Sequence, residues 1–242
     1  MSSKSNDQGR AFEMACLLAL GETIVKFRKY EKVVFERNSS FEAATRAWKN
    51  TDENFQDTVL KAARAMADKL ADLEPIMVEN DDETIVLKIQ KDEEGEKGDV
   101  RDILIIRGES GWEIGLSVKH NHFAVKHSRL SPSIDFGDKW YGIHCSKTYW
   151  DSITPIFTYL KEQKSLMKNW SDLPNKDGAV YVPLLNAFME EIKRANSVDP
   201  AFPRRMVEYL LGEYDFYKVI SLDAKKTTNI QSFNLRGTLN QA

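Results

Sequence analysis

The sequence has few cysteines, no long apolar run and no N-terminal stretch typical of a secretion signal. Its two cysteines, Cys16 and Cys145, are too few for a disulfide framework or a four-thiolate zinc site. No segment approaches the ~18 uninterrupted apolar residues of a membrane span, and the opening MSSKSNDQGR has no apolar core. These absences predict a cytoplasmic protein with reduced cysteines and no membrane partner.

An excess of basic charge is also missing, because 34 basic residues face 37 acidic ones and give a net charge of −3. This balance does not exclude nucleic-acid binding, since phosphates require a basic face and not a basic total. Residues 114–134 contain no acid, and neither does the chain after Asp223. The sequence therefore indicates two basic tracts on an acidic background.

The spacing of apolar residues predicts helices and strands in succession. Helices are expected at 8–30, from Ser39 to about Trp48, from Asp52 to before Pro75, and at 147–168, 183–195 and 204–211. Ser39 with Glu42 three residues later is typical of a capping box. Strands are expected at 84–90, 102–107, 112–119, 214–220 and 229–235, the first three antiparallel. The pattern favours an α/β fold, or an α+β one, with helices on both sides of a short mixed sheet.

The hairpin closed by GESG, residues 108–111, carries the first chemical signal. If the turn is symmetric, Arg107 faces Trp112, and Asp102 lies opposite Ser117 with Lys119 diagonally adjacent on the same face. A carboxylate at a strand start can hold Mg²⁺, and a neighbouring lysine can position or deprotonate the attacking water or neutralise charge on phosphorus. The alternative is an ordinary cross-strand ion pair that contributes about 0.2–1 kcal/mol.

GDVRDILIIR (98–107) and WEIGLSVKHNHFAVKHSRLS (112–131) resemble the HaeIII family of type II restriction endonucleases, within the PD-(D/E)XK nuclease superfamily. The likeness extends from QGRAFE to FNLRGTLN. It implies one nuclease domain over 1–242, with a helical part (1–75), a catalytic hairpin region (84–135) and a helical and β part (146–242) that is shortened or truncated. It also implies Mg²⁺-dependent cleavage of double-stranded DNA at the palindrome GGCC, with a cognate DNA methyltransferase as genetic partner.

The resemblance assigns roles to individual residues of the hairpin. Asp102 matches the metal-binding aspartate, Lys119 the catalytic lysine, and the carbonyl of Val118 an additional metal ligand. Ser117 stands where the superfamily has its second acidic residue, two positions before the lysine. This departure leaves the second metal carboxylate open. It also leaves room for a cleavage-inactive DNA-binding relative, or for a metal-dependent repair or RNA nuclease on the same scaffold.

Two other acids are candidates for the second metal ligand. Glu13, in GRAFE, resembles the helical glutamate that many of these nucleases bring to the site, although a solvated helix residue is the plain alternative. Asp99 is closer to Asp102 in sequence, but lies on the other face of the strand unless a bulge intervenes.

The basic tract after Lys119 is expected to leave the strand and contact DNA phosphates or base edges. Its candidates are His120, Asn121, His122, Lys126, His127 and Arg129. Zinc binding by the three histidines and solvated surface charges are the alternatives. Arg204 and Arg205, at a predicted helix start, are further candidates for phosphate contact. A palindromic target suits a homodimer, but the sequence leaves the oligomeric state open.

Overall fold

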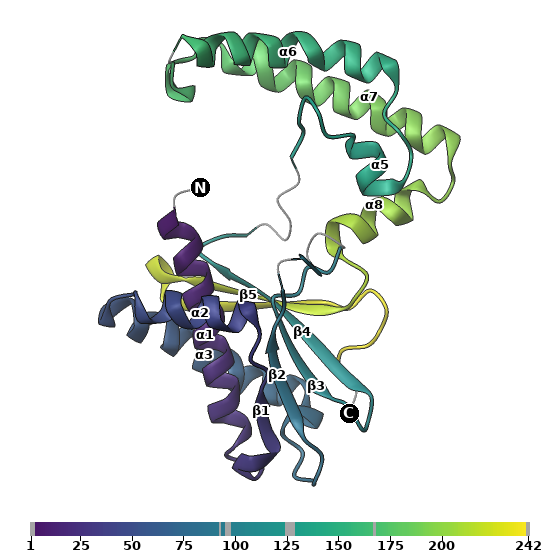
Figure 1. Ribbon diagram of the computed structural model, residues 1–242. Coiled ribbons are helices and arrows are strands. Elements are labelled where there is room, and N and C mark those ends of the chain that lie inside the picture. The colour runs from purple at the N-terminus through teal and green to yellow at the C-terminus, as the bar shows by residue number, and fades with distance from the viewer. Residues whose placement is uncertain (1–2, 92, 95–97, 124–128, 167, 241–242) are drawn as a thin grey trace. The chain divides into compact units, whose positions relative to one another are not determined.

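The computed structural model describes residues 3–91, 93–94, 98–123, 129–166 and 168–240 (Figure 1). The chain separates into two compact units. The first, here the sheet unit, comprises Met1–Lys126 and Leu211–Ala242, and the second, the helical unit, comprises His127–Leu210. Each is described by itself. That the chain works as a single nuclease domain stays a prediction.

Among the described residues of the sheet unit, six strands form one mixed sheet in sequence order. β1 and β2 pair in parallel, as do β4 and β5, and the other neighbours are antiparallel. The strands are β1 Val33–Phe35, β2 Ile85–Ile89, β3 Ile103–Arg107, β4 Trp112–His120, β5 Phe216–Leu222 and β6 Thr227–Phe233. The expected α/β class with a short mixed sheet and flanking helices is confirmed.

Three helices pack against one face of this sheet (Figure 1). They are α1 Ser3–Ile24, α2 Ser39–Lys49 and α3 Glu53–Leu73. Alternate residues of the strands, such as Ile105, Ile114 and Leu116, are fully buried against them. Each such side chain contributes about 1.5–3 kcal/mol on burial. The core therefore fixes which face of each strand points away from the helices.

The first predicted helix, over 8–30, extends too far. α1 ends at Ile24, where Arg28 N–H donates to the Ile24 carbonyl and the chain turns toward β1. The sequence did not predict β1, because three residues are too few to show an alternation of apolar and polar side chains. The Phe35 ring of β1 lies 2.5 Å from where a Cβ of Gly21 would stand, so this glycine allows helix and strand to approach closely.

The predicted cap of the second helix is also wrong by one residue. The helix α2 begins at Ser39, but Asn38 is its N-cap and accepts a hydrogen bond from the Phe41 N–H at 2.9 Å. Asp52 caps α3 in the same way through Phe55. An asparagine side chain serves this role as well as serine does.

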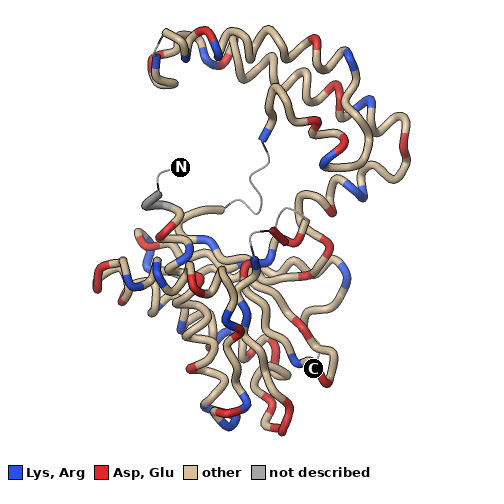
Figure 2. Tube along the Cα trace, viewed as in Figure 1, with Lys and Arg blue, Asp and Glu red and all other residues tan. Residues whose placement is uncertain are grey.

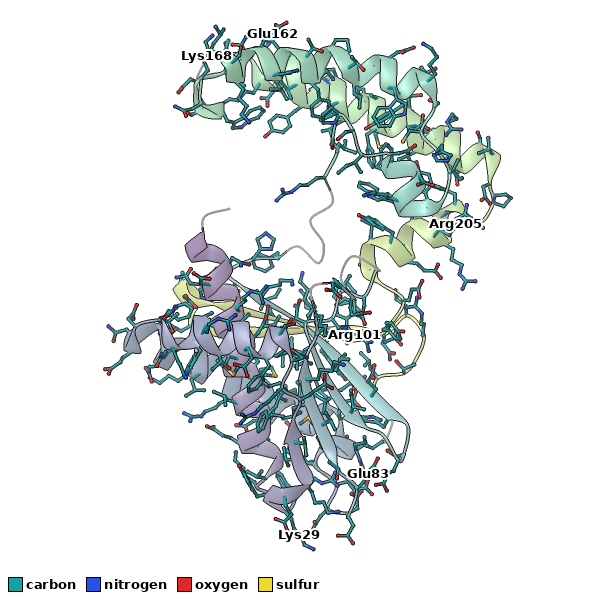
Figure 3. All side chains as sticks on the ribbon, in the orientation of Figure 1. Lys29, Glu83, Arg101, Glu162, Lys168 and Arg205 are labelled. Atoms are coloured by element: carbon teal, nitrogen blue, oxygen red, sulfur yellow. The ribbon has the colours of Figure 1, made fainter. Side chains whose placement is uncertain are left out.

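The predicted hairpin register is confirmed. Arg107 pairs with Trp112, and Ile103 with Leu116. Arg107 is buried at the closed end, where its Nε donates to Glu83 at 2.9 Å. Glu83, labelled in Figure 3, also accepts from the Ser110 N–H of the turn at 2.9 Å. This buried pair ties the turn to the strands and opposes a slip of register.

The helical unit packs its helices around an aromatic cluster that includes Phe136, Trp140 and Tyr149. The predicted helices at 147–168, 183–195 and 204–211 are confirmed within a few residues, while the short α5 was missed. The helices are α5 Phe136–Tyr141, α6 Lys147–Ser165, α7 Val182–Val198 and α8 Phe202–Leu211. Short helical turns over both units are η1 Tyr30–Lys32, η2 Pro75–Val78, η3 Trp170–Asp172, η4 Asp177–Tyr181 and η5 Asp223–Lys225.

No helix in the described ranges is long and apolar enough to cross a membrane. Both cysteines are free and buried.

Candidate active site

Asp102 and Lys119 meet where β3 begins and β4 ends. The Asp102 N–H donates to the Leu116 carbonyl at 2.7 Å, so the strand pairing continues one residue past β3. Lys119 Nζ lies 2.9 Å from Asp102 Oδ2, and the two side chains are 23% and 26% exposed. The predicted pair therefore exists, and solvent reaches both of its charged groups.

The hydrogen bonds that described residues donate to the Asp102 carboxylate fall on one oxygen. Oδ2 accepts from the Val118 N–H at 2.6 Å, from Lys119 Nζ at 2.9 Å and from Ser117 Oγ at 3.4 Å. No residue in the described part of the chain donates to Oδ1. Three groups of β4 thus fix one oxygen of Asp102.

Glu13 approaches the same place from α1. Burial, followed by the negative charges of Glu13 and Asp102, raises the pKa of the Cys16 thiol well above its ordinary value. Cys16 therefore lies within electrostatic reach of both carboxylates. The ring centroids of Phe12 and His120 are 6.1 Å apart, which places this part of α1 beside the end of β4.

Asp99 has a different partner. Arg101 Nη2 binds Asp99 Oδ2 at 2.7 Å, and Arg101 Nε binds Oδ1 at 2.9 Å. Arg101, labelled in Figure 3, also binds Glu113 at 2.7 Å and lies over the ring of Tyr214. The guanidinium of Arg101 therefore binds both carboxylate oxygens of Asp99. The role of Asp99 as a metal ligand stays a prediction.

His120 and His122, the described histidines of the tract after Lys119, belong to no cluster of metal ligands. In the described ranges, no group of three or more His, Cys, Asp and Glu side chains is placed to hold an ion. His120 Nε2 lies 2.8 Å from Asp223 Oδ2, and Asn121 Nδ2 binds the same oxygen at 3.1 Å. The described histidines therefore give the zinc alternative no support.

The remaining predicted DNA contacts belong to both units of the chain. His122 is half-buried in the sheet unit, while Lys126 and His127 lie outside the described residues. Arg129, Arg204 and Arg205 belong to the helical unit. Arg129 is exposed, Arg204 binds Glu208 at 2.8 Å, and Arg205 binds Asp199. Figure 2 shows basic and acidic residues interspersed along the trace.

Lys218 is a buried cation that sequence reasoning missed. It lies on β5, directly beside Ser117 in the parallel pairing with β4, and its Nζ donates to the Phe123 carbonyl. Burial, and then the charge of Lys119, lowers the pKa of Lys218. The one available signal was a lysine in the centre of the apolar run FYKVISL.

Comparisons with known proteins agree with the expected resemblance. The family model for the HaeIII restriction endonuclease matches residues 9–242. The type II restriction enzyme HaeIII of Haemophilus aegyptius is 48% identical over 242 residues, which are all of this chain and 75% of that protein. No solved structure matches the chain significantly. With a family match along nearly its whole length and a relative of this similarity, the chain belongs to the HaeIII restriction endonuclease family.

Proposed function

We propose that the chain is a type II restriction endonuclease that hydrolyses phosphodiester bonds of double-stranded DNA at GGCC with Mg²⁺. The observation that carries this proposal is the 2.9 Å contact between Lys119 and Asp102 on paired strands of a fixed register. The mixed sheet with such a pair at one strand end supports a PD-(D/E)XK type of core. A DNA methyltransferase of the same specificity is proposed as genetic partner, and a homodimer suits the palindrome.

The donor set suits Mg²⁺. This ion binds oxygen ligands, through one or two carboxylates together with substrate phosphates and water. Asp102 Oδ1, the Glu13 carboxylate and the Val118 carbonyl would hold it. When bound, the ion would lower the pKa of a water molecule and neutralise negative charge on the phosphate.

The residues of the chain supply orientation and charge. The Val118 N–H and Ser117 Oγ hold Asp102 in one position. Asp102 in turn holds the Lys119 ammonium, which would orient or activate the attacking water for in-line displacement. The same ammonium would stabilise the negative charge that develops on the phosphorane oxygens, and a donor fixed in advance requires no reorganisation during the reaction.

Ser117 favours a second candidate, a DNA-binding relative that does not cleave. Its hydroxyl stands where the superfamily has a carboxylate, and it donates to Asp102 at 3.4 Å. If Glu13 does not replace that carboxylate, DNA is bound without being cut.

Digestion of plasmid DNA with and without Mg²⁺, followed by sequencing of the fragment ends, tests both candidates. Asp102→Ala and Lys119→Ala are each expected to lower the cleavage rate by about 10³-fold or more, because each removes a group that acts in the transition state. Lys61→Ala, at an exposed lysine of α3 paired with Asp57, is the matched control.

Circular dichroism checks that each variant folds. A folded Lys119→Ala variant that cuts at the wild-type rate would contradict the proposal. A gel shift without fragments would support the binding-only relative. The lack of a discrete set of fragments that end at GGCC, without a gel shift, would point to a repair or RNA nuclease.

A further inference from the structure

Lys218 lies on the same face of the sheet as the candidate catalytic pair. β5 runs parallel to β4, and the register places Lys218 beside Ser117 and Ile220 beside Lys119. Side chains of paired strand residues point to the same face. Lys218 therefore occupies the strand next to Lys119, on the side of the sheet that carries the site.

The charge of Lys218 is poorly balanced. Its ammonium is buried and donates to the backbone carbonyl of Phe123. Among the described residues no carboxylate forms an ion pair with it, and the like charge of Lys119, after burial, lowers its pKa. Burying an ammonium without an opposite charge costs several kcal/mol. The arrangement lowers stability, so a functional role accounts for it better than a structural one.

The bond to Phe123 fastens the chain that leaves β4. The Asn121 N–H donates to the Ser221 carbonyl at 2.8 Å, which extends the pairing with β5 by one residue. Lys218 holds the chain two residues further, at Phe123, whose own side chain is 57% exposed. Phe123 lies within the basic tract after Lys119, between the candidate DNA contacts His122 and Lys126 in the sequence.

We propose that Lys218 is a positioning residue for DNA binding, which acts by holding Phe123 within the basic tract that follows Lys119. This inference rests on the proposed function. Since the bond fixes a binding segment and not a reacting group, its loss weakens the interaction with DNA more than the chemical step. A second lysine on the strand next to Lys119 also adds to the positive potential that a phosphate meets.

The test compares Lys218→Met and Lys218→Arg with wild type in steady-state cleavage of GGCC-containing DNA. Methionine has a similar length without charge or donors, and arginine keeps both. Lys218→Met is expected to raise KM at least tenfold with kcat within about threefold, and to leave the melting temperature unchanged or higher, because an apolar side chain replaces a buried charge. Lys218→Arg is expected to recover most of the affinity. Lys61→Met on α3 is the control for the change of residue type.

A folded Lys218→Met variant with wild-type KM would overturn the proposal. The proposal would also be overturned if the variant loses activity only in proportion to the fraction of protein that no longer folds. If Lys218→Met does not fold, Lys218→Gln replaces it, and a wild-type KM in that variant has the same meaning. Binding of the DNA with Ca²⁺, which takes the same oxygen ligands, gives Kd independently of cutting. A wild-type chain that binds but does not cut would refute the proposed function alone, and Kd then decides the role of Lys218. A chain that does neither would refute both.

Discussion

Two carboxylates that lie three residues apart in sequence, Asp99 and Asp102, have different environments. Both oxygens of Asp99 bind the guanidinium of Arg101. Oδ2 of Asp102 accepts hydrogen bonds from three donors of β4, and Oδ1 has no donor among the described residues. A buried guanidinium needs a fixed anion, whereas a metal ligand needs a free lone pair. This difference favours the proposed role of Asp102 as the metal ligand over a role of Asp99.

Glu13 and Asp99, the two candidates for the second metal ligand, are expected to respond differently to the loss of their negative charge. Glu13→Gln is expected to raise the Mg²⁺ concentration for half-maximal cleavage at least tenfold with little change in stability, because a neutral amide binds the cation less well than a carboxylate. Asp99→Asn is expected to lower the free energy of unfolding by roughly 1–3 kcal/mol, since it leaves a buried guanidinium less well paired.

Magnesium titrations of the cleavage rate and urea unfolding measure the two effects. The reverse pattern, in which Asp99→Asn raises the Mg²⁺ requirement and Glu13→Gln has no effect, would make Asp99 the ligand.

At the scale of the element, Gly115 lets the side chain of Arg101 pack directly on the backbone of β4, the strand that contributes both to the core and to the candidate site. A Cβ at this position would lie 2.0 Å from Arg101 Cδ, and the guanidinium of Arg101 is fixed by Asp99 and Glu113. The side chain of Arg101 therefore lies flat on β4 next to the site, which a larger residue would prevent.

Gly115→Ala is accordingly expected to lower the free energy of unfolding by about 1–3 kcal/mol, as overpacking does in a filled interior. Gly108→Ala is the matched control, because nothing lies within 4 Å of a Cβ at that position in the turn. Urea unfolding of both variants measures the difference. Equal stability of the two would show that Arg101 moves away without cost.

The start of α5 predicts a dependence on pH. Burial favours the neutral form of Asp135, but hydrogen bonds from the backbone N–H groups of Asp138 and Cys145 more than offset it, and the pKa falls to about 2 from an ordinary 3.8. Because the folded pKa is the lower one, the stabilisation is complete above about pH 4 and is lost as the pH falls toward 2. Its size is about 2 kcal/mol.

Asp135→Asn removes the titrating group and keeps an oxygen acceptor. Its free energy of unfolding is therefore expected to change less than that of wild type between pH 4 and pH 2. Unfolding followed by tryptophan fluorescence reports on this region through Trp140, which packs on Phe136. Parallel pH profiles of the two proteins would contradict the assignment.

At the scale of the whole molecule, a net charge of −3 must be reconciled with a polyanionic substrate. Long-range attraction by the total charge is absent, so binding depends on local cations that displace counterions from the DNA. Arg129, which is exposed, lies in the acid-free stretch 114–134.

Arg129→Gln is expected to weaken the binding of all DNA sequences alike and to reduce the slope of log K against log salt by about 1. Filter binding or fluorescence anisotropy at several salt concentrations measures this slope, with GGCC and non-GGCC duplexes compared. A loss restricted to GGCC DNA would mean that Arg129 reads a base and not a phosphate.

Local sequence predicted the central hairpin well. Its alternation of apolar and polar residues, and a turn of defined length, set the register that pairs Arg107 with Trp112. β1 was not predictable, because three residues show no period and its pairing with β2 spans distant parts of the chain. The N-cap of α2 was predicted wrongly because Asn38 and Ser39 are both good capping residues, and local sequence does not distinguish between them.

The sequence by itself determined the family, the hairpin and the placing of Asp102 and Lys119 on one face, because these depend on short-range periodicity and on a recognisable string of residues. Tertiary structure alone decided that Phe12 of α1 lies beside His120 at the end of β4, and that Lys218 of β5 lies buried beside Ser117. These contacts join residues whose separation along the chain carries no periodic signal, and they form only when helices and strands pack into one core.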